Sequence, residues 1–173
     1  MNFRLVFFIV FSFLLAGARA EGNPYSEKTI KRALKYANKV WSEHEVGLEP
    51  LVADPSSGNY SSQDTLFKLI GMESTHLGYL LLSSAKGRFD FFDFMVIYTR
   101  ELELVELRIL VYRSEQGSQV TSRVWLKQFY GSPPFENKQY GSDVNALSGA
   151  TFSAKSLTEQ VNRLNSLMME LHR

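Results

Sequence analysis

The sequence contains no cysteine among its 173 residues. This absence excludes disulfide bonds, thiolate catalysis, zinc sites with cysteine ligands and iron–sulfur clusters. It also excludes a lipoprotein anchor on an N-terminal cysteine. The only three histidines, His44, His76 and His172, lie far apart in the sequence. Because none belongs to a pair with metal-ligand spacing, we expect no metal site built on histidine.

An excess of charge of one sign is missing as well. Lys and Arg total 19 while Asp and Glu total 18, which gives a net charge of +1 and no basic run. We therefore expect no nucleic-acid partner and no polybasic membrane patch. Apolar residues are plentiful, since 45% of the residues are hydrophobic and 13% are aromatic. That content is enough for a proper hydrophobic core.

The first twenty residues have the three parts of a signal peptide. Arg4 gives a positive start, the stretch 5–15 is an almost unbroken apolar run, and Ala18 and Ala20 are small residues at a cleavage site. The run is too short for a transmembrane anchor, which needs about 20 residues. We expect residues 1–20 to be removed and the mature protein to be periplasmic or secreted. What remains is one domain's worth of chain.

Periodicity of the apolar residues predicts the elements. Helical spacing predicts helices over residues 25–45, with Ser26 as the cap, over 124–129, and from about residue 153 onward. The Pro-, Ser- and Gly-rich stretch 49–64 is predicted to be a loop. Strands are predicted where β-branched and aromatic residues concentrate, in the segments 65–71, 77–85, 90–99 and 104–114.

The last predicted strand alternates in a regular way. Val105, Leu107, Ile109 and Val111 form an apolar face that is predicted to meet the core, with the residues between them on the other face. Short turn segments at 84–87 and 100–103 suit hairpins. We therefore predict a single α+β domain, an antiparallel sheet flanked by N- and C-terminal helices. Residues 21–65 supply a helix and a loop, and residues 66–173 supply the main domain.

The segment most informative about function is Ser148-Gly149-Ala150-Thr151, which directly precedes the last helix. A helix start presents free backbone N–H groups and the positive end of the helix dipole to a phosphate. Gly149 permits a tight turn, Ala150 adds almost no bulk, and the hydroxyls of Ser148 and Thr151 can bond phosphate oxygens. Thr151 could also be esterified.

The alternative for this segment is ordinary N-capping. Ser and Thr are favoured helix caps, and Gly often precedes a helix. A four-residue motif also arises by chance in roughly one chain in a few hundred of this length. The residues alone leave both interpretations open.

The wider context of the motif carries a resemblance. "DVNALSGATFSAKSLTEQVN" resembles the signature of the FMN-binding domain found in RnfG- and NqrC-like proteins, which are extracytoplasmic electron-transfer domains. "LGYLLLSSAKGRFDFFDFMVIY", "LVELRILVYRSEQGSQV" and "WLKQF" are similar to upstream elements of the same family. The resemblance covers roughly residues 66–167, so residues 66–173 are expected to form an FMN-binding domain.

The resemblance implies covalent FMN. The family's threonine, here Thr151, carries the flavin through a phosphoester bond that a separate FAD-dependent, magnesium-requiring flavin transferase forms. Ser148, Gly149 and Ala150 are then the turn beside the phosphate. One position departs from the family pattern, because Asn145 stands where an Asp is usual. We therefore expect flavin binding more firmly than covalent attachment.

Other side chains are candidates for contact with the flavin. The resemblance implies that Glu115 lies in a turn that approaches the ring, although a solvated hairpin glutamate is equally compatible with the sequence. Trp125, Phe129 and Tyr130 have flat faces that could stack on the ring, with core packing as their alternative. Lys127 could pair with the phosphate or lie on the surface.

Three functions agree with these observations. In the first, the chain is an exported flavoprotein that carries electrons between membrane or periplasmic redox proteins, with no catalytic residues of its own. In the second, it is a flavin-free periplasmic accessory or binding module of the same fold, which Asn145 favours. In the third, it is a flavin-dependent reductase with Glu115 or Tyr130 as the proton donor.

Overall fold

The computed structural model describes residues 23–42, 45–131 and 136–172. The predicted signal peptide and His44 lie outside the described residues. The helices are α2 (Glu27–Val40), α3 (Arg123–Leu126) and α4 (Thr151–Leu171), and the strands are β1 (Gly47–Leu51), β2 (Thr65–Ile70), β3 (His76–Lys86), β4 (Phe91–Thr99) and β5 (Leu104–Val111). Short 3-10 helices occupy Met72–Ser74, Ser118–Thr121 and Lys127–Phe129.

The five strands form one sheet in the order β1-β2-β3-β4-β5, and every neighbouring pair is antiparallel. The predicted α+β class is therefore confirmed. The prediction of a loop from residue 49 is wrong at its start, because β1 extends to Leu51 and pairs with β2. Pro50 lies opposite Phe67. A proline is tolerated there because β1 is an edge strand, where a missing N–H breaks no central ladder.

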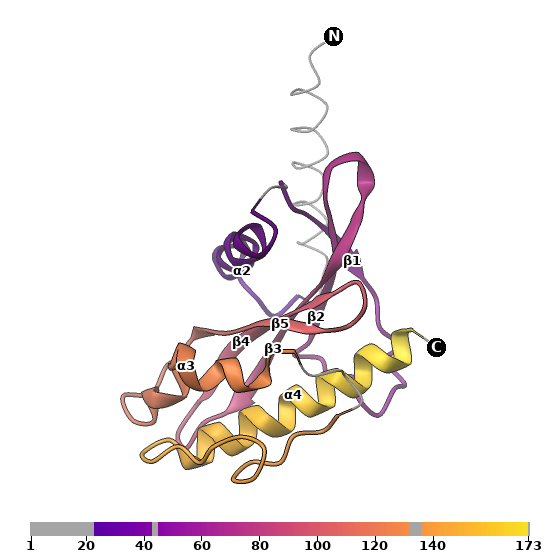
Figure 1. Ribbon diagram of the computed structural model, residues 1–173. Coiled ribbons are helices and arrows are strands. Elements are labelled where there is room, and N and C mark those ends of the chain that lie inside the picture. The colour runs from indigo at the N-terminus through magenta and orange to yellow at the C-terminus, as the bar shows by residue number, and fades with distance from the viewer. Residues whose placement is uncertain (1–22, 43–44, 132–135, 173) are drawn as a thin grey trace.

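Both faces of the sheet are covered, α2 on one and α4 on the other (Figure 1). Phe94 and Val96 of β4 point into the core beneath α4, whereas Met95 and Ile97 point into the core beneath α2. All four side chains are fully buried. Strands buried on both faces read as continuous apolar runs, which explains the composition of β3 and β4.

The predicted core face of β5 is wrong. Leu107 and Ile109 pack under α4, but Val105 and Val111 pack against the opposite core with α2. The pairing of β4 with β5 shifts register twice, between Asp93 and Phe94 and between Ile97 and Tyr98. Each shift inserts one extra residue on β5, and a slip of one residue moves every following side chain to the other face.

Both long helices follow their sequence signals. Ser26 caps α2, since its hydroxyl accepts from the Thr29 N–H at 3.2 Å. The predicted stripe of α4 is buried at its centre, where Leu157, Val161 and Leu164 are at most 1% exposed. Burial of each such side chain stabilises the fold by about 1.5–3 kcal/mol. The stripe fixes how α4 lies across the sheet and therefore where its first turn stands.

A buried ion pair fixes α4 further along its length. Arg163 of α4 donates from both terminal nitrogens to the two carboxylate oxygens of Asp64, each at 2.7 Å. Ser83 of β3 donates to the same carboxylate at 2.7 Å. The carboxylate is inaccessible to solvent. A bidentate pair of this kind holds the helix against β2 and β3 in one register.

Candidate functional site

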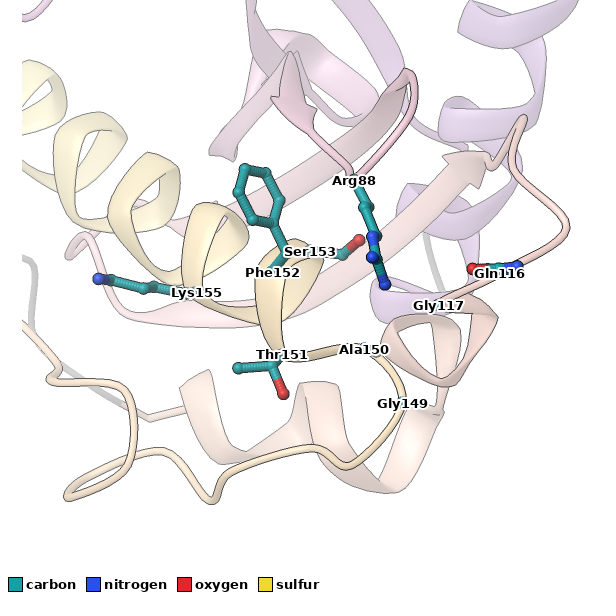
Figure 2. Close-up of a pocket in the computed structure, with 9 residues that line it drawn as sticks. All are labelled: Arg88, Gln116, Gly117, Gly149, Ala150, Thr151, Phe152, Ser153 and Lys155. Atoms are coloured by element: carbon teal, nitrogen blue, oxygen red, sulfur yellow. The ribbon is translucent and has the colours of Figure 1, made fainter.

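Three segments that are distant in the sequence meet at the start of α4 and enclose an open cavity of about 430 Å³ (Figure 2). The turn between β3 and β4 contributes Arg88, and the loop after β5 contributes Gln116 and Gly117. The remaining lining residues are consecutive or nearly so: Gly149, Ala150, Thr151, Phe152, Ser153 and Lys155. The volume falls in the range of roughly 300–1,000 Å³ typical of small-molecule pockets.

The start of α4 faces this cavity without a capping side chain. The N-cap residue is Ala150, and in the described part of the chain no side chain caps the helix and no acidic residue lies in its first turn. The interpretation of the motif as ordinary N-capping is therefore wrong. Uncapped first-turn N–H groups and an uncompensated dipole favour an anion at this end of the helix.

The turn before α4 gives Thr151 its exposure. Gly149 has a φ of +78°, which L side chains rarely adopt. The Ala150 N–H donates to the Leu147 carbonyl at 3.2 Å and closes the turn. The Thr151 hydroxyl donates to the same carbonyl at 3.4 Å, a long and weak bond. Because Thr151 is exposed and only weakly held, its hydroxyl is accessible for modification.

The loop after β5 is tied to the first turn of α4 by two hydroxyls. Tyr112 donates its one proton to the Gln116 carbonyl at 2.8 Å. The buried Ser153 hydroxyl therefore donates to the Tyr112 oxygen, 3.1 Å away. A Cβ on Gly117 would lie 2.6 Å from that same oxygen. The chain passes close to Tyr112 at this point because residue 117 has no side chain.

The cavity lining is cationic. Arg88 and Lys155 are its two charged residues, and none of its nine described residues is acidic. The Arg88 guanidinium lies over the ring of Phe89, 5.4 Å from the centroid. Within the described residues, neither Arg88 nor Lys155 forms an ion pair with a carboxylate. Two unpaired cations beside an uncapped helix start suit a ligand with negative charge.

Of the six residues predicted to bind the cofactor, Gly149, Ala150 and Thr151 line the cavity. Ser148 is exposed and adjoins the lining without being part of it. Glu115 is also exposed, and its loop reaches the cavity through the next residue, Gln116.

Asn145 is held through its backbone and does not line the cavity. The Trp125 ring nitrogen donates to the Asn145 carbonyl at 2.8 Å, and the Asn145 N–H donates to the Gln128 side-chain oxygen at 2.9 Å. The side chain of Asn145 is exposed. It therefore faces solvent.

The aromatic residues named from the sequence are not the ones at the cavity. Trp125 and Phe129 are buried and pack against each other with ring centroids 5.6 Å apart. Tyr130 donates to Glu106 beside β5, and burial together with this carboxylate raises the pKa of its phenol to about 12. The aromatic side chain that lines the cavity is Phe152, which is 53% exposed.

Sequence reasoning missed Phe152, Arg88 and Lys155, whereas the loop of Gln116 and Gly117 belongs to the turn that the resemblance named through Glu115. A signal existed for Phe152, because it is a large apolar residue that lies off the predicted stripe of its helix. Lys155 could have been found as the residue four positions after Thr151, on the same helix face. Arg88 reaches the site through the fold alone.

Two histidines gather at the other end of α4. His172 shares a 2.6 Å hydrogen bond with the Tyr79 hydroxyl and a 2.9 Å one with the Met168 carbonyl. The His76 ring packs edge-on against the Tyr79 ring, with centroids 4.7 Å apart. Partial burial and nearby Lys68 lower the pKa of His76. No group of three or more metal-ligating side chains gathers within the described residues.

Comparison of the sequence with protein-family models and with curated proteins gave no match. Among the helices that the structure describes, none is long and apolar enough to cross a membrane.

Proposed function

We propose that the chain is an exported flavoprotein domain that carries electrons, with FMN bound at the α4 cavity and esterified through its phosphate to Thr151. The observation that supports this most is the uncapped start of α4, which opens into a cavity lined by two cations and no acidic residue. A phosphate there gains about 0.3–1 kcal/mol from the helix dipole, and more where it is partly buried.

The described residues are compatible with FMN. Each of the three backbone turns at the cavity contains a glycine, Gly87, Gly117 or Gly149, and Gly149 has a φ of +78°. The backbone can thus approach a phosphate closely. The lining combines main-chain N–H groups, two cations and one exposed phenyl ring, which match the phosphate and the apolar ring system of a flavin.

Each part of the site has a defined task. The first-turn N–H groups of α4 hold the phosphate oxygens, and Lys155 offsets their charge. In the attachment step, the Thr151 oxygen bonds to the FMN phosphorus of FAD, the bond to AMP breaks, and the hydroxyl proton is released. When bound, the flavin supplies the redox chemistry.

The proposed location and partners follow from the same function. A signal peptide in residues 1–20 brings the chain to the compartment of an FAD-dependent flavin transferase. The ester keeps the cofactor from being lost outside the cytoplasm. Electron donors and acceptors are then membrane or periplasmic redox proteins, and no nucleic acid is involved. An electron carrier of this kind needs no acid–base pair of its own.

A specific observation favours a second function, a flavin-free accessory or binding module of the same fold. Asn145 replaces the usual acidic residue of the motif, and its side chain is exposed. A transferase that reads a carboxylate at this position would leave the chain unmodified. In this case the cavity would either bind no ligand or bind another small anion.

The two functions are separated by loading the exported protein in a host with an active flavin transferase. We expect a yellow protein whose flavin absorbance survives denaturation in the wild type and is lost in Thr151→Ala. Ser148→Ala is the matched control, since Ser148 is an equally exposed hydroxyl three residues away. A colourless wild type that also fails to bind added FMN contradicts the proposal and favours the flavin-free module.

A further inference from the structure

Phe152 is the exposed large apolar side chain that lines the cavity. It is the second residue of α4, it is 53% exposed, and it lines the cavity instead of joining the buried stripe of its helix. An exposed phenyl ring leaves apolar surface in water, which costs free energy in proportion to its area. A flat apolar ligand on this ring would remove that surface from water.

Arg88 lines the same cavity from the turn between β3 and β4 (Figure 2). Its guanidinium is a flat cation that already lies over one aromatic ring, that of Phe89, at 5.4 Å. Among the described residues it has no carboxylate partner. Guanidinium groups stack on aromatic faces as well as pairing with anions. Arg88 therefore offers a second flat surface to a ligand in the cavity.

We propose that Phe152 and Arg88 form the two sides of a slot that holds the isoalloxazine ring, so that the phenyl ring contacts one face and the guanidinium the other. This inference rests on the proposed function. Thr151 directly precedes Phe152, so a flavin attached at Thr151 is tethered next to the slot. The slot uses the side chain of Phe152, whereas the first-turn backbone N–H groups of α4 bind the phosphate.

The slot has an electronic consequence. Uptake of two electrons and one proton adds one negative charge to a flavin ring. A cation that contacts the ring stabilises this charge and favours reduction. Arg88 is thus assigned the role of raising the reduction potential, whereas Phe152 excludes water from one face of the ring and carries no charge.

Two substitutions test the slot, each with a matched control. Phe152→Leu removes one flat face, and Phe91→Leu is its control, because Phe91 is also 53% exposed and does not line the cavity. Arg88→Gln removes the cation, and Lys86→Gln is its control on the same hairpin outside the lining. All four positions are exposed, so the variants are expected to fold, which circular dichroism checks.

Three readouts are taken on protein loaded by the transferase: the mass of the Thr151 adduct, quenching of flavin fluorescence by iodide, and the reduction potential. We expect the adduct in all variants. Phe152→Leu and Arg88→Gln should both admit iodide more readily than wild type, and Arg88→Gln should shift the potential to a more negative value. Both controls should match wild type.

The outcomes distinguish this inference from the proposed function. A wild type without adduct that binds no FMN overturns both. An adduct with iodide quenching and potential unchanged in Phe152→Leu and Arg88→Gln overturns the slot and leaves the proposed function standing. A change in iodide quenching in only one of the two variants also overturns the slot, because a ring that lies between two groups becomes more accessible when either is lost.

Discussion

Gly117 offers a quantitative test of how the cavity wall is built. Its φ of +80° lies in the left-handed region, and a Cβ there would approach the Tyr112 oxygen to 2.6 Å. In Gly117→Ala the backbone conformation costs about 1–2 kcal/mol. Tyr112 must also move, which breaks its bonds to Gln116 and Ser153, each worth about 0.5–1.5 kcal/mol. The expected loss of stability is therefore about 2–5 kcal/mol.

Two other glycines separate these contributions. Gly141 has a φ of +87° with no atom within 4 Å of an added Cβ, so Gly141→Ala should lose only the backbone part, about 1–2 kcal/mol. Gly58 has open space and no left-handed φ, so Gly58→Ala should change stability by less than about 0.5 kcal/mol. Urea unfolding of each variant, followed by circular dichroism, gives the three free energies.

The decisive comparison pairs Gly117→Ala with Tyr112→Phe. Removing the hydroxyl also removes the clash, so Gly117→Ala in the Tyr112→Phe background should cost only about 1–2 kcal/mol. If Gly117→Ala costs the same in both backgrounds, the close approach to Tyr112 does not determine the wall of the cavity, and the reasoning fails.

Two further predictions concern groups away from the cavity. Arg163→Met should destabilise the fold by about 3–5 kcal/mol in urea unfolding, because it leaves the carboxylate of Asp64 buried and unpaired. Lys31→Met, which breaks an exposed pair, should cost less than about 0.5 kcal/mol, and equal losses would contradict this account. Burial and Glu106 raise the pKa of Tyr130 to about 12, above the unfolded value of about 10. The stability that the neutral Tyr130 phenol contributes is thus fully present below pH 10 and is lost as the pH rises through 12. A difference in unfolding free energy between wild type and Tyr130→Phe that stays constant across this pH range would refute the prediction.

Much of the fold could be predicted because its signals are local. The strands β2 to β5 and the helix α4 can be recognised in the sequence from their runs and spacing of apolar residues. The edge strand β1 could not be found, since it has five residues, contains Pro50 and adjoins a Pro-, Ser- and Gly-rich stretch. The side of the sheet on which Val105 and Val111 lie could not be predicted either, because it depends on the bulges in the pairing of β4 with β5.

Some residues of the candidate site could likewise be predicted from the sequence, and others could not. Gly149, Ala150 and Thr151 were identified because phosphate chemistry at a helix start needs a contiguous motif. The resemblance also indicated the turn of Glu115, which contains Gln116 and Gly117. Arg88 belongs to another loop, and only the antiparallel pairing of β3 and β4 brings it to α4. Trp125 and Phe129 were plausible ring contacts by residue type, but their buried environment depends on the whole core.

The central claim is tested most directly by peptide mapping of protein exported beside an active flavin transferase. Trypsin releases residues 139–155 as one peptide that contains Thr151. We predict that this peptide gains the mass of one FMN less one water, that fragmentation places the addition on Thr151, and that Thr151→Ala abolishes it. An unmodified peptide from a chain that does not bind added FMN would contradict the account.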